Sequence, residues 1–121
     1  MNFLAVFIGG GLGSICRYGI AVWLKPSEFI FPYATLLANI ISCIVLGCLI
    51  TLGQKSFFSS STYLLLATGF CGGFSTFSTF TAETFALFEN GQETLAFINI
   101  AASLLICLGA IFLGIKLSSL L

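Results

Sequence analysis

Four long apolar stretches, separated by short polar connections, occupy most of this 121-residue chain. A helix needs about 20 mainly apolar residues to cross the hydrocarbon core of a bilayer, and each stretch is long enough. The stretches predict four membrane-spanning helices, which cover approximately residues 2–24, 32–52, 62–88 and 94–117. We expect them to form a single transmembrane domain, residues 1–121, with an all-α fold.

The chain carries too little charge to present a water-soluble surface. Only 7% of its residues are charged and 59% are hydrophobic, whereas soluble domains carry roughly 25% charged residues. Its outside must therefore be apolar as well, so the solvent around it is lipid. We expect a multi-pass protein of the cell membrane, inner or plasma, with the lipid bilayer as its surroundings and no nucleic-acid partner.

The inventory of side chains argues against catalysis. The chain has no His, so the commonest acid–base residue is missing. Its only acids are Glu28, Glu83, Glu89 and Glu93. Five cysteines form no CxxC pair, which gives little support to a zinc site or a disulfide framework. We expect the cysteines to be small buried hydrophobic residues, and we expect no enzyme activity.

Positive charge is divided evenly between the two sides of the predicted domain. With four spans, Lys55 and Lys116 fall on one side, and Lys25 and Arg17 fall on the other. An excess of Lys and Arg on one side normally sets the orientation of a membrane protein. Two explanations stay open: the charges are too few to set an orientation, or the chain inserts both ways and pairs with an inverted copy of itself.

The third stretch contains a run of glycine and hydroxyl residues, Gly69 to Phe80, that suits a helix interior poorly. Each glycine costs about 1 kcal/mol relative to alanine, and Ser and Thr compete for backbone hydrogen bonds. Close packing of small residues would explain Gly69 and Gly73, but it would not need the hydroxyl groups. The run therefore predicts a helix broken near mid-membrane, where exposed carbonyls could bind a small hard cation such as Na⁺.

Two phenylalanines follow the glycines. Phe77 and Phe80 lie three residues apart, which places them on one face of a helix. The edge of an aromatic ring is electropositive, so two ring edges can attract an anion without holding it tightly, as conduction requires. The pair predicts part of an anion path beside the hydroxyl residues, with simple packing as the alternative.

Two other predicted helices each carry a polar stripe on one face. The stripes are Thr35, Asn39 and Ser42 in the second helix and Asn99, Ser103 and Cys107 in the fourth. Amide and hydroxyl groups can donate hydrogen bonds to an anion that sheds water, or to a neighbouring helix. Either use is open for any single residue, and three stripes together favour a polar track.

Two charged residues lie inside the predicted spans, Arg17 in the first and Glu83 in the third. A charge at the bilayer centre costs about 2.5–3.5 kcal/mol on insertion scales, so each is expected to face water or a partner. Arg17 could reach the membrane surface or draw anions toward a vestibule. Glu83 is expected to be protonated or to hold a structural position.

The sequence resembles the Fluc (CrcB) family of fluoride channels in three blocks that occur in the family's order and spacing. The blocks are Gly9-Gly10-Gly11-Leu12-Gly13-Ser14 with Arg17-Tyr18, Pro32 with Thr35-Leu36 and Asn39, and the run Gly69 to Phe80. The resemblance covers essentially the whole chain. It implies a fluoride-selective channel, built as an antiparallel dual-topology dimer, that exports cytoplasmic fluoride passively and so reduces fluoride toxicity.

The resemblance also implies roles for individual residues. The fluoride pore would be lined by Phe77, Phe80, Asn39, Ser78, Thr79 and Ser103. A structural Na⁺ would be held by the backbone carbonyls of Gly72 and Ser75, at the interface with an inverted second subunit. That subunit is expected to be a second copy of this chain, with a different homologue as the alternative. Three positions depart from the family pattern and affect the polar track: Ala34, Ser42 and Cys107.

Two other functions stay open. A small multidrug-resistance transporter also has four helices in an inverted dimer, but that proton-coupled exporter needs a carboxylate in its first helix, and residues 2–24 contain none. The chain could instead be a non-transporting partner subunit of a heteromeric channel, in which case the polar stripes would only join helices.

Overall fold

The computed structural model describes residues 1–121, except for the side chain of Pro26. Three of its helices are long and apolar enough to cross a membrane. They are α1 (Asn2–Leu24), α2 (Tyr33–Gln54) and α6 (Glu93–Ser119). A short 3-10 turn, η1 (Pro26–Glu28), follows α1. These helices confirm three of the predicted spans, and the protein is a multi-pass membrane protein.

The third predicted span is divided among several helical segments. They are α3 (Ser60–Tyr63), the π-helix η2 (Leu64–Cys71), α4 (Gly72–Phe74) and α5 (Phe77–Glu89). Ser75 and Thr76 have extended backbone angles, with ψ of 158° and 122°, and they separate α4 from α5. The depth of this interruption in a bilayer stays a prediction.

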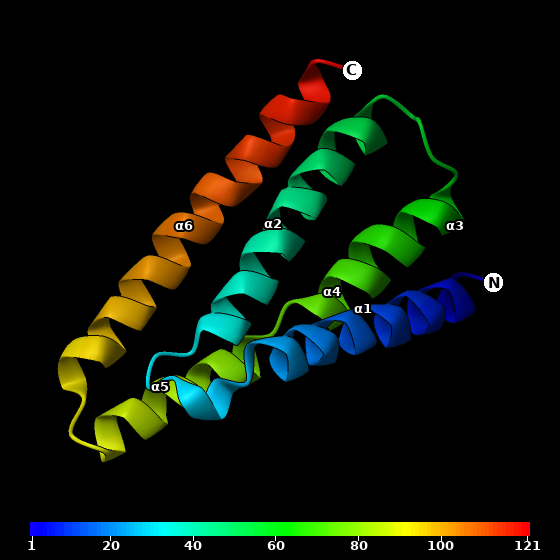
Figure 1. Ribbon diagram of the computed structural model, residues 1–121. Helices are drawn as coiled ribbons and strands as arrows, with labels where there is room; N and C mark the ends of the chain where they lie inside the picture. The colour runs from blue at the N-terminus through cyan, green and yellow to red at the C-terminus, as the bar shows by residue number, and fades with distance from the viewer.

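Helix α1 packs along η2 and α4, and glycines let the backbones approach closely there. Figure 1 shows α1 beside α4. A Cβ atom on Gly13 would collide with the carbonyl oxygen of Phe70, and one on Gly73 would collide with that of Gly10. Gly69 approaches α1 almost as closely, since its Cβ would lie 2.8 Å from the Val6 carbonyl oxygen. The small-residue packing considered for Gly69 and Gly73 is therefore present, alongside the interruption at Ser75 and Thr76.

Helices α2 and α6 lie side by side, as the teal and orange-to-red ribbons of Figure 1 show. Here too glycines allow contact between backbones: a Cβ on Gly47 would collide with the Ile111 carbonyl oxygen, and one on Gly114 with that of Ile44. We call this contact the α2–α6 seam. Its short interhelical distance holds the two helices in a fixed register.

Small residues supply much of the buried core, while large apolar side chains point outward. The buried hydrophobic residues are Ala34, Ala38, Leu49, Cys71, Phe74, Leu87, Ala96 and Ala110. Phe3, Leu105 and Phe112 are among the exposed ones, as a lipid-facing surface requires. All five cysteines are free; Cys71 is buried as expected, but Cys16 is exposed, so the expectation of burial is wrong there.

The connection between α5 and α6 explains why the chain reverses at residue 91. Gly91 has φ +69°, a conformation that glycine adopts without penalty. The N–H of Gln92 donates to the Leu87 carbonyl at 2.8 Å, and that of Gly91 donates to the Phe88 carbonyl at 3.1 Å. This is the Schellman pattern of a helix C-terminus, and it confirms the turn between the third and fourth spans.

Candidate functional site

The interruption between α4 and α5 is held in place by the side chain of Asn39 from α2. The N–H of Thr76 donates to Asn39 Oδ1 at 2.8 Å, and Asn39 Nδ2 donates to the Thr76 carbonyl oxygen at 3.3 Å. In a continuous helix the Thr76 N–H would instead bond to the Gly72 carbonyl. Asn39 therefore replaces helical bonding at Thr76, and its amide keeps one N–H for another acceptor.

Thr76 also begins α5, as its N-cap residue. Its Oγ1 accepts the N–H of Thr79 at 3.2 Å, and its hydroxyl donates to Thr79 Oγ1 at 3.1 Å. In a continuous helix that Thr79 N–H would bond to the Ser75 carbonyl. The carbonyls of Gly72 and Ser75 thus share one property. The N–H group that would donate to each of them in a continuous helix bonds to a side chain instead.

The two neighbouring carbonyls have donors of their own. The Cys71 oxygen accepts the Ser75 N–H at 2.9 Å, Ser75 Oγ at 2.8 Å and Ser42 Oγ at 3.0 Å. The Gly73 oxygen accepts Arg17 Nε from α1 at 3.1 Å. Hydrogen bonding therefore distinguishes Gly72, one of the two predicted cation ligands, from the carbonyls of Cys71 and Gly73 on either side of it.

The ends of two helices meet at this interruption. The continuous helical run formed by α3, η2 and α4 ends at Phe74 with the negative end of its dipole, and α5 begins at Phe77 with its positive end. The first N–H groups of a helix have no intrahelical acceptor and favour an anion, whereas the last carbonyls favour a cation. The backbone therefore places a region suited to each sign of charge within a few residues.

Phe77 and Phe80 lie together on α5, with their ring centroids 5.7 Å apart and their planes inclined at 40°. They line a cavity of about 220 Å³, which we call the phenylalanine cavity. Its other lining residues include Asn39, Cys43, Ser75, Thr76, Ser103 and Cys107. The structure thus brings together four of the residues assigned to the pore: Phe77, Phe80, Asn39 and Ser103.

The remaining predicted pore residues lie elsewhere. Ser78 is exposed, with its hydroxyl 3.4 Å from Thr76 Oγ1. Thr79 lines a second cavity of about 300 Å³, together with both charged residues of the spans, Arg17 and Glu83. Thr76 lines this second cavity and the phenylalanine cavity, so the two adjoin at the interruption.

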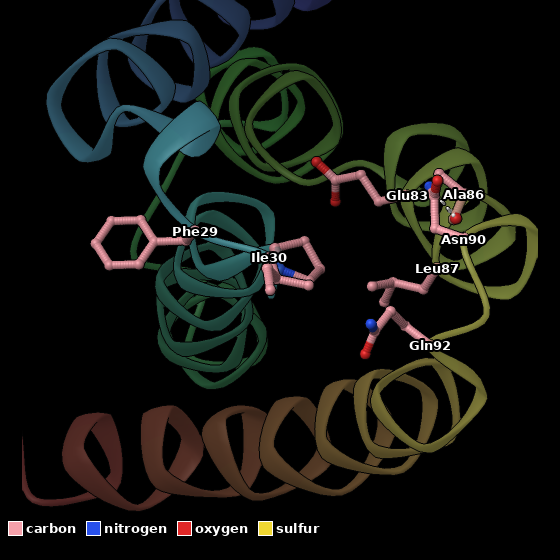
Figure 2. Close-up of a pocket in the computed structure, with 8 residues that line it drawn as sticks. Phe29, Ile30, Glu83, Ala86, Leu87, Asn90 and Gln92 are labelled. Atoms are coloured by element: carbon pink, nitrogen blue, oxygen red, sulfur yellow. Dashed lines mark hydrogen bonds between the residues drawn. The ribbon is translucent and has the colours of Figure 1, made fainter.

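Glu83 lines the second cavity and also a third one of about 460 Å³. Figure 2 shows this third cavity between Phe29 and Ile30 on one side and the last turns of α5, with Gln92, on the other. Thr35 Oγ1 donates to Glu83 Oε1 at 2.8 Å, but Glu83 Oε2 is buried and has no partner among the described residues. A buried oxygen of this kind needs a donor or a proton.

A chain of hydrogen bonds connects α6 to the carbonyl of Phe80. Ser103 Oγ donates to Asn99 Oδ1 at 3.4 Å, Asn99 Nδ2 donates to Thr84 Oγ1 at 2.8 Å, and the Thr84 hydroxyl donates to the Phe80 oxygen at 2.7 Å. The sequence analysis did not single out Thr84. Its position four residues after Phe80 could have done so, because a threonine hydroxyl in a helix can donate to the carbonyl four residues earlier.

Some residues of the polar stripes join helices by hydrogen bonds, and others line the phenylalanine cavity. Thr35, Ser42 and Asn99 bond to residues of neighbouring helices, so hydrogen bonding between helices describes these three. Ser103 and Cys107 both line the phenylalanine cavity, as a polar track requires. The stripe of α6 is thus part support and part cavity wall.

An all-helical multi-pass protein with adjoining cavities at an interrupted span has the architecture expected of a membrane channel or transporter. Residues 4–115 match the family described as CrcB-like protein, Camphor Resistance (CrcB). The chain therefore belongs to the CrcB family, which confirms the resemblance found in its sequence.

Curated relatives cover nearly the whole chain. It is 47% identical over 116 residues to the fluoride-specific ion channel FluC of Pyrococcus abyssi, covering 95% of this chain and 94% of that one. It is 40% identical over 115 residues to the FluC protein of Chlorobium chlorochromatii, with 94% and 89% covered. The FluC protein of Rhizobium etli is 40% identical over 116 residues, with 94% and 93% covered. These relatives are named as channels, in agreement with the expectation that the chain is not an enzyme.

Proposed function

We propose that this protein is a fluoride-selective channel through which cytoplasmic fluoride leaves the cell passively. The observation that carries the proposal is the phenylalanine cavity, where two rings face amide and hydroxyl groups in a chain whose relatives are named fluoride-specific ion channels. Fluoride enters cells as uncharged HF and dissociates inside. A passive path down the electrochemical gradient is then sufficient to reduce fluoride toxicity.

Selectivity would come from many weak donors rather than from a fixed positive charge. Phe77 and Phe80 offer ring edges, Asn39 retains one N–H, and Ser103 offers a hydroxyl group. The positive end of α5 adds to the attraction at Phe77. A small anion that must shed its water is served by closely spaced donors, and weak sites let it leave again.

Arg17, Ser78 and Thr79 would extend the path beyond the phenylalanine cavity. Arg17 lies beside Thr79 in the second cavity, where its charge draws anions toward the interruption. Ser78 and Thr79 supply further hydroxyl groups around Thr76. Glu83 shares the second cavity, so we assign it a neutral, structural role, because an ionised carboxylate would repel the anion.

The functional unit would be a dimer of two inverted copies of this chain, with pores formed between them. Phe77 is 78% exposed and Gly72 is also exposed, so a single chain leaves both residues without a covering surface. The even division of Lys and Arg supports insertion in both orientations. A different homologue in place of the second copy is the alternative.

A structural Na⁺ would lie where the two inverted subunits meet. The carbonyls of Gly72 and Ser75 suit it for two reasons. The N–H groups that would donate to them in a continuous helix bond to side chains, and both carbonyls lie where the continuous helical run from Ser60 to Phe74 ends. Unwound carbonyls are a recurring ligand set for this ion in membrane proteins. Na⁺ supplies positive charge that holds the two interruptions together, and it takes no chemical part in conduction.

Fluoride efflux from liposomes tests the proposal. Purified protein should release trapped fluoride, measured with a fluoride electrode, and should release little chloride from matched liposomes. Equal chloride release would contradict the selectivity. Release only after a homologue is added would assign the chain to a heteromeric channel. A proton-coupled drug exporter is not favoured, since α1 carries no carboxylate.

A further inference from the structure

We propose that Cys43 of α2 and Cys107 of α6 form a binding site for a soft divalent metal cation. Such a cation prefers two thiolate ligands, and Hg²⁺ is the representative example. We further propose that the bound ion closes the phenylalanine cavity. The second statement rests on the proposed channel function, whereas the first stands without it.

The two thiols lie on the two helices of the α2–α6 seam, in the wall of the phenylalanine cavity. Both side chains line that cavity, so the two thiols border the same small space. Cys43 precedes Gly47 by four residues and Cys107 precedes Gly114 by seven, so each shares a helical face with a glycine of the seam. Because these glycines bring the backbones together, both thiols are held by the packing of the helices.

The remaining surroundings select the kind of metal. Among the described residues, no group of three or more Cys, His, Asp or Glu side chains could hold a metal ion, so a four-ligand zinc site is not supplied. Two thiolates suit a soft cation of low coordination number. Hard cations such as Mg²⁺ prefer oxygen ligands.

Charge balance favours a divalent ion at this position. Two thiols and one Hg²⁺ give one S–Hg–S unit and release two protons to the solution, and the product carries no net charge. No electron is transferred. A monovalent soft cation held by two thiolates would leave a negative charge in a low-dielectric interior, which is costly. The neutral product therefore suits a site within the membrane.

Occupancy of the site would obstruct the cavity beside the phenylalanine pair. Cys43 and Cys107 share the cavity of about 220 Å³ with Phe77 and Phe80, so a metal between the thiols takes space that an anion needs. Cys48 is a matched control on α2, because its thiol lies 3.2 Å from the Gly114 carbonyl oxygen and does not line this cavity.

Direct binding tests the first statement. Full-length protein carrying Cys16→Ala, which removes the exposed thiol, is incubated with Hg²⁺ in detergent, freed of excess metal, and assayed for mercury by elemental analysis. In that background, Cys43→Ala and Cys107→Ala should each abolish the same bound ion, whereas Cys48→Ala should not. If each of the two changes removes a different share of the mercury and their losses add, the thiols bind independently and the site is disproved.

Fluoride efflux in the presence of Hg²⁺ tests the second statement. Flux should fall to the level of protein-free liposomes for the Cys16→Ala and Cys48→Ala proteins. Cys43→Ala and Cys107→Ala should each keep the flux they have without metal. Mercury bound at the pair without loss of flux would overturn the blocking role. No flux even without metal would overturn the proposed function, and the binding measurement would still decide whether the site exists.

Discussion

The amide of Asn39 pairs with both backbone polar groups of Thr76, accepting its N–H at 2.8 Å and donating to its carbonyl oxygen at 3.3 Å. A residue of α2 thus fixes the backbone at the point where the third span is interrupted. The resemblance gives Asn39 a role as a fluoride donor. The structure adds a second role, as the support of the backbone that carries the two predicted ion sites.

Replacement of Asn39 should damage stability and flux together. Asn39→Ala leaves the N–H and carbonyl of Thr76 without partners, and each unsatisfied buried group costs about 1–3 kcal/mol. We expect a lower thermal midpoint in detergent and loss of fluoride efflux. Ser42→Ala is the control, because the Cys71 carbonyl keeps two bonds from Ser75 when Ser42 is removed. Equal effects of the two changes would contradict the assigned role.

The phenylalanine pair should control flux without controlling folding. Phe77→Ile and Phe80→Ile keep an apolar side chain but remove the electropositive ring edge. Fluoride efflux is expected to fall about tenfold or more in each, equivalent to about 1.4 kcal/mol. Phe85→Ile is the matched control, since Phe85 lies on α5, is 61% exposed and lines none of the described cavities. Normal efflux in both test variants would remove the pair from the path.

Sodium should stabilise the assembled protein by mass action. A ligand that binds only the native state raises stability as its concentration exceeds its dissociation constant. Replacing Na⁺ with N-methylglucamine should therefore lower the thermal midpoint of the solubilised dimer and reduce fluoride efflux. Identical melting in the two solutions would remove Na⁺ from the interface.

Thr76→Val should weaken this dependence on Na⁺. It removes the hydroxyl acceptor of the Thr79 N–H, which fixes the first turn of α5 next to the Ser75 carbonyl, so this predicted cation ligand is held less firmly. Loss of the N-cap alone costs about 1 kcal/mol. Thr81→Val is the control, because the Thr81 hydroxyl donates to the Phe77 carbonyl and caps nothing. The same Na⁺ dependence in both variants would contradict the carbonyl assignment.

Glu83→Gln should conduct fluoride, because the proposed role of Glu83 needs its shape and not its charge. The amide oxygen can still accept from Thr35, while the amide nitrogen occupies the position of Oε2. Glu83→Ala leaves the Thr35 hydroxyl without its acceptor and should lower the thermal midpoint, at a cost of about 1–3 kcal/mol. A Gln variant that folds but has no efflux would show that the negative charge itself is required.

Even one additional methyl group in the α2–α6 seam should lower the stability of the folded protein. Gly47→Ala places a Cβ against the Ile111 carbonyl oxygen, and overpacking of this kind costs about 1–3 kcal/mol. Gly109→Ala on α6 meets nothing within 4 Å, so it should be neutral or stabilising through its helix propensity. Thermal unfolding of both variants in detergent checks this, and a Gly47→Ala protein as stable as its control would contradict the seam.

Local sequence predicted the spans and the family well. The ends of α1, α2 and α6 lie within two residues of the predicted bounds, because the cost of placing polar groups in lipid limits each span residue by residue. The run from Gly69 to Phe80 marked the unusual segment for a similar reason. Glycines and hydroxyl residues disfavour a regular helix whatever surrounds them.

Contacts between helices could not be predicted from the local sequence. Three features involve residues far apart in the chain: the pairing of Asn39 with Thr76, the bond from Arg17 to the Gly73 carbonyl, and the cavity that Cys43 and Cys107 both line. The glycine seams bring those helices together, and the registers of two helices decide which polar groups face each other.

Sequence by itself determined that this chain lies in a membrane and which family it belongs to, and it marked Gly69 to Phe80 as a segment unsuited to a regular helix. Tertiary structure alone decided that the side chains of Asn39 and Thr76 take over the hydrogen bonds of that segment. Burial in lipid depends on each residue's own chemistry. A hydrogen bond between helices depends on the position of both partners in space.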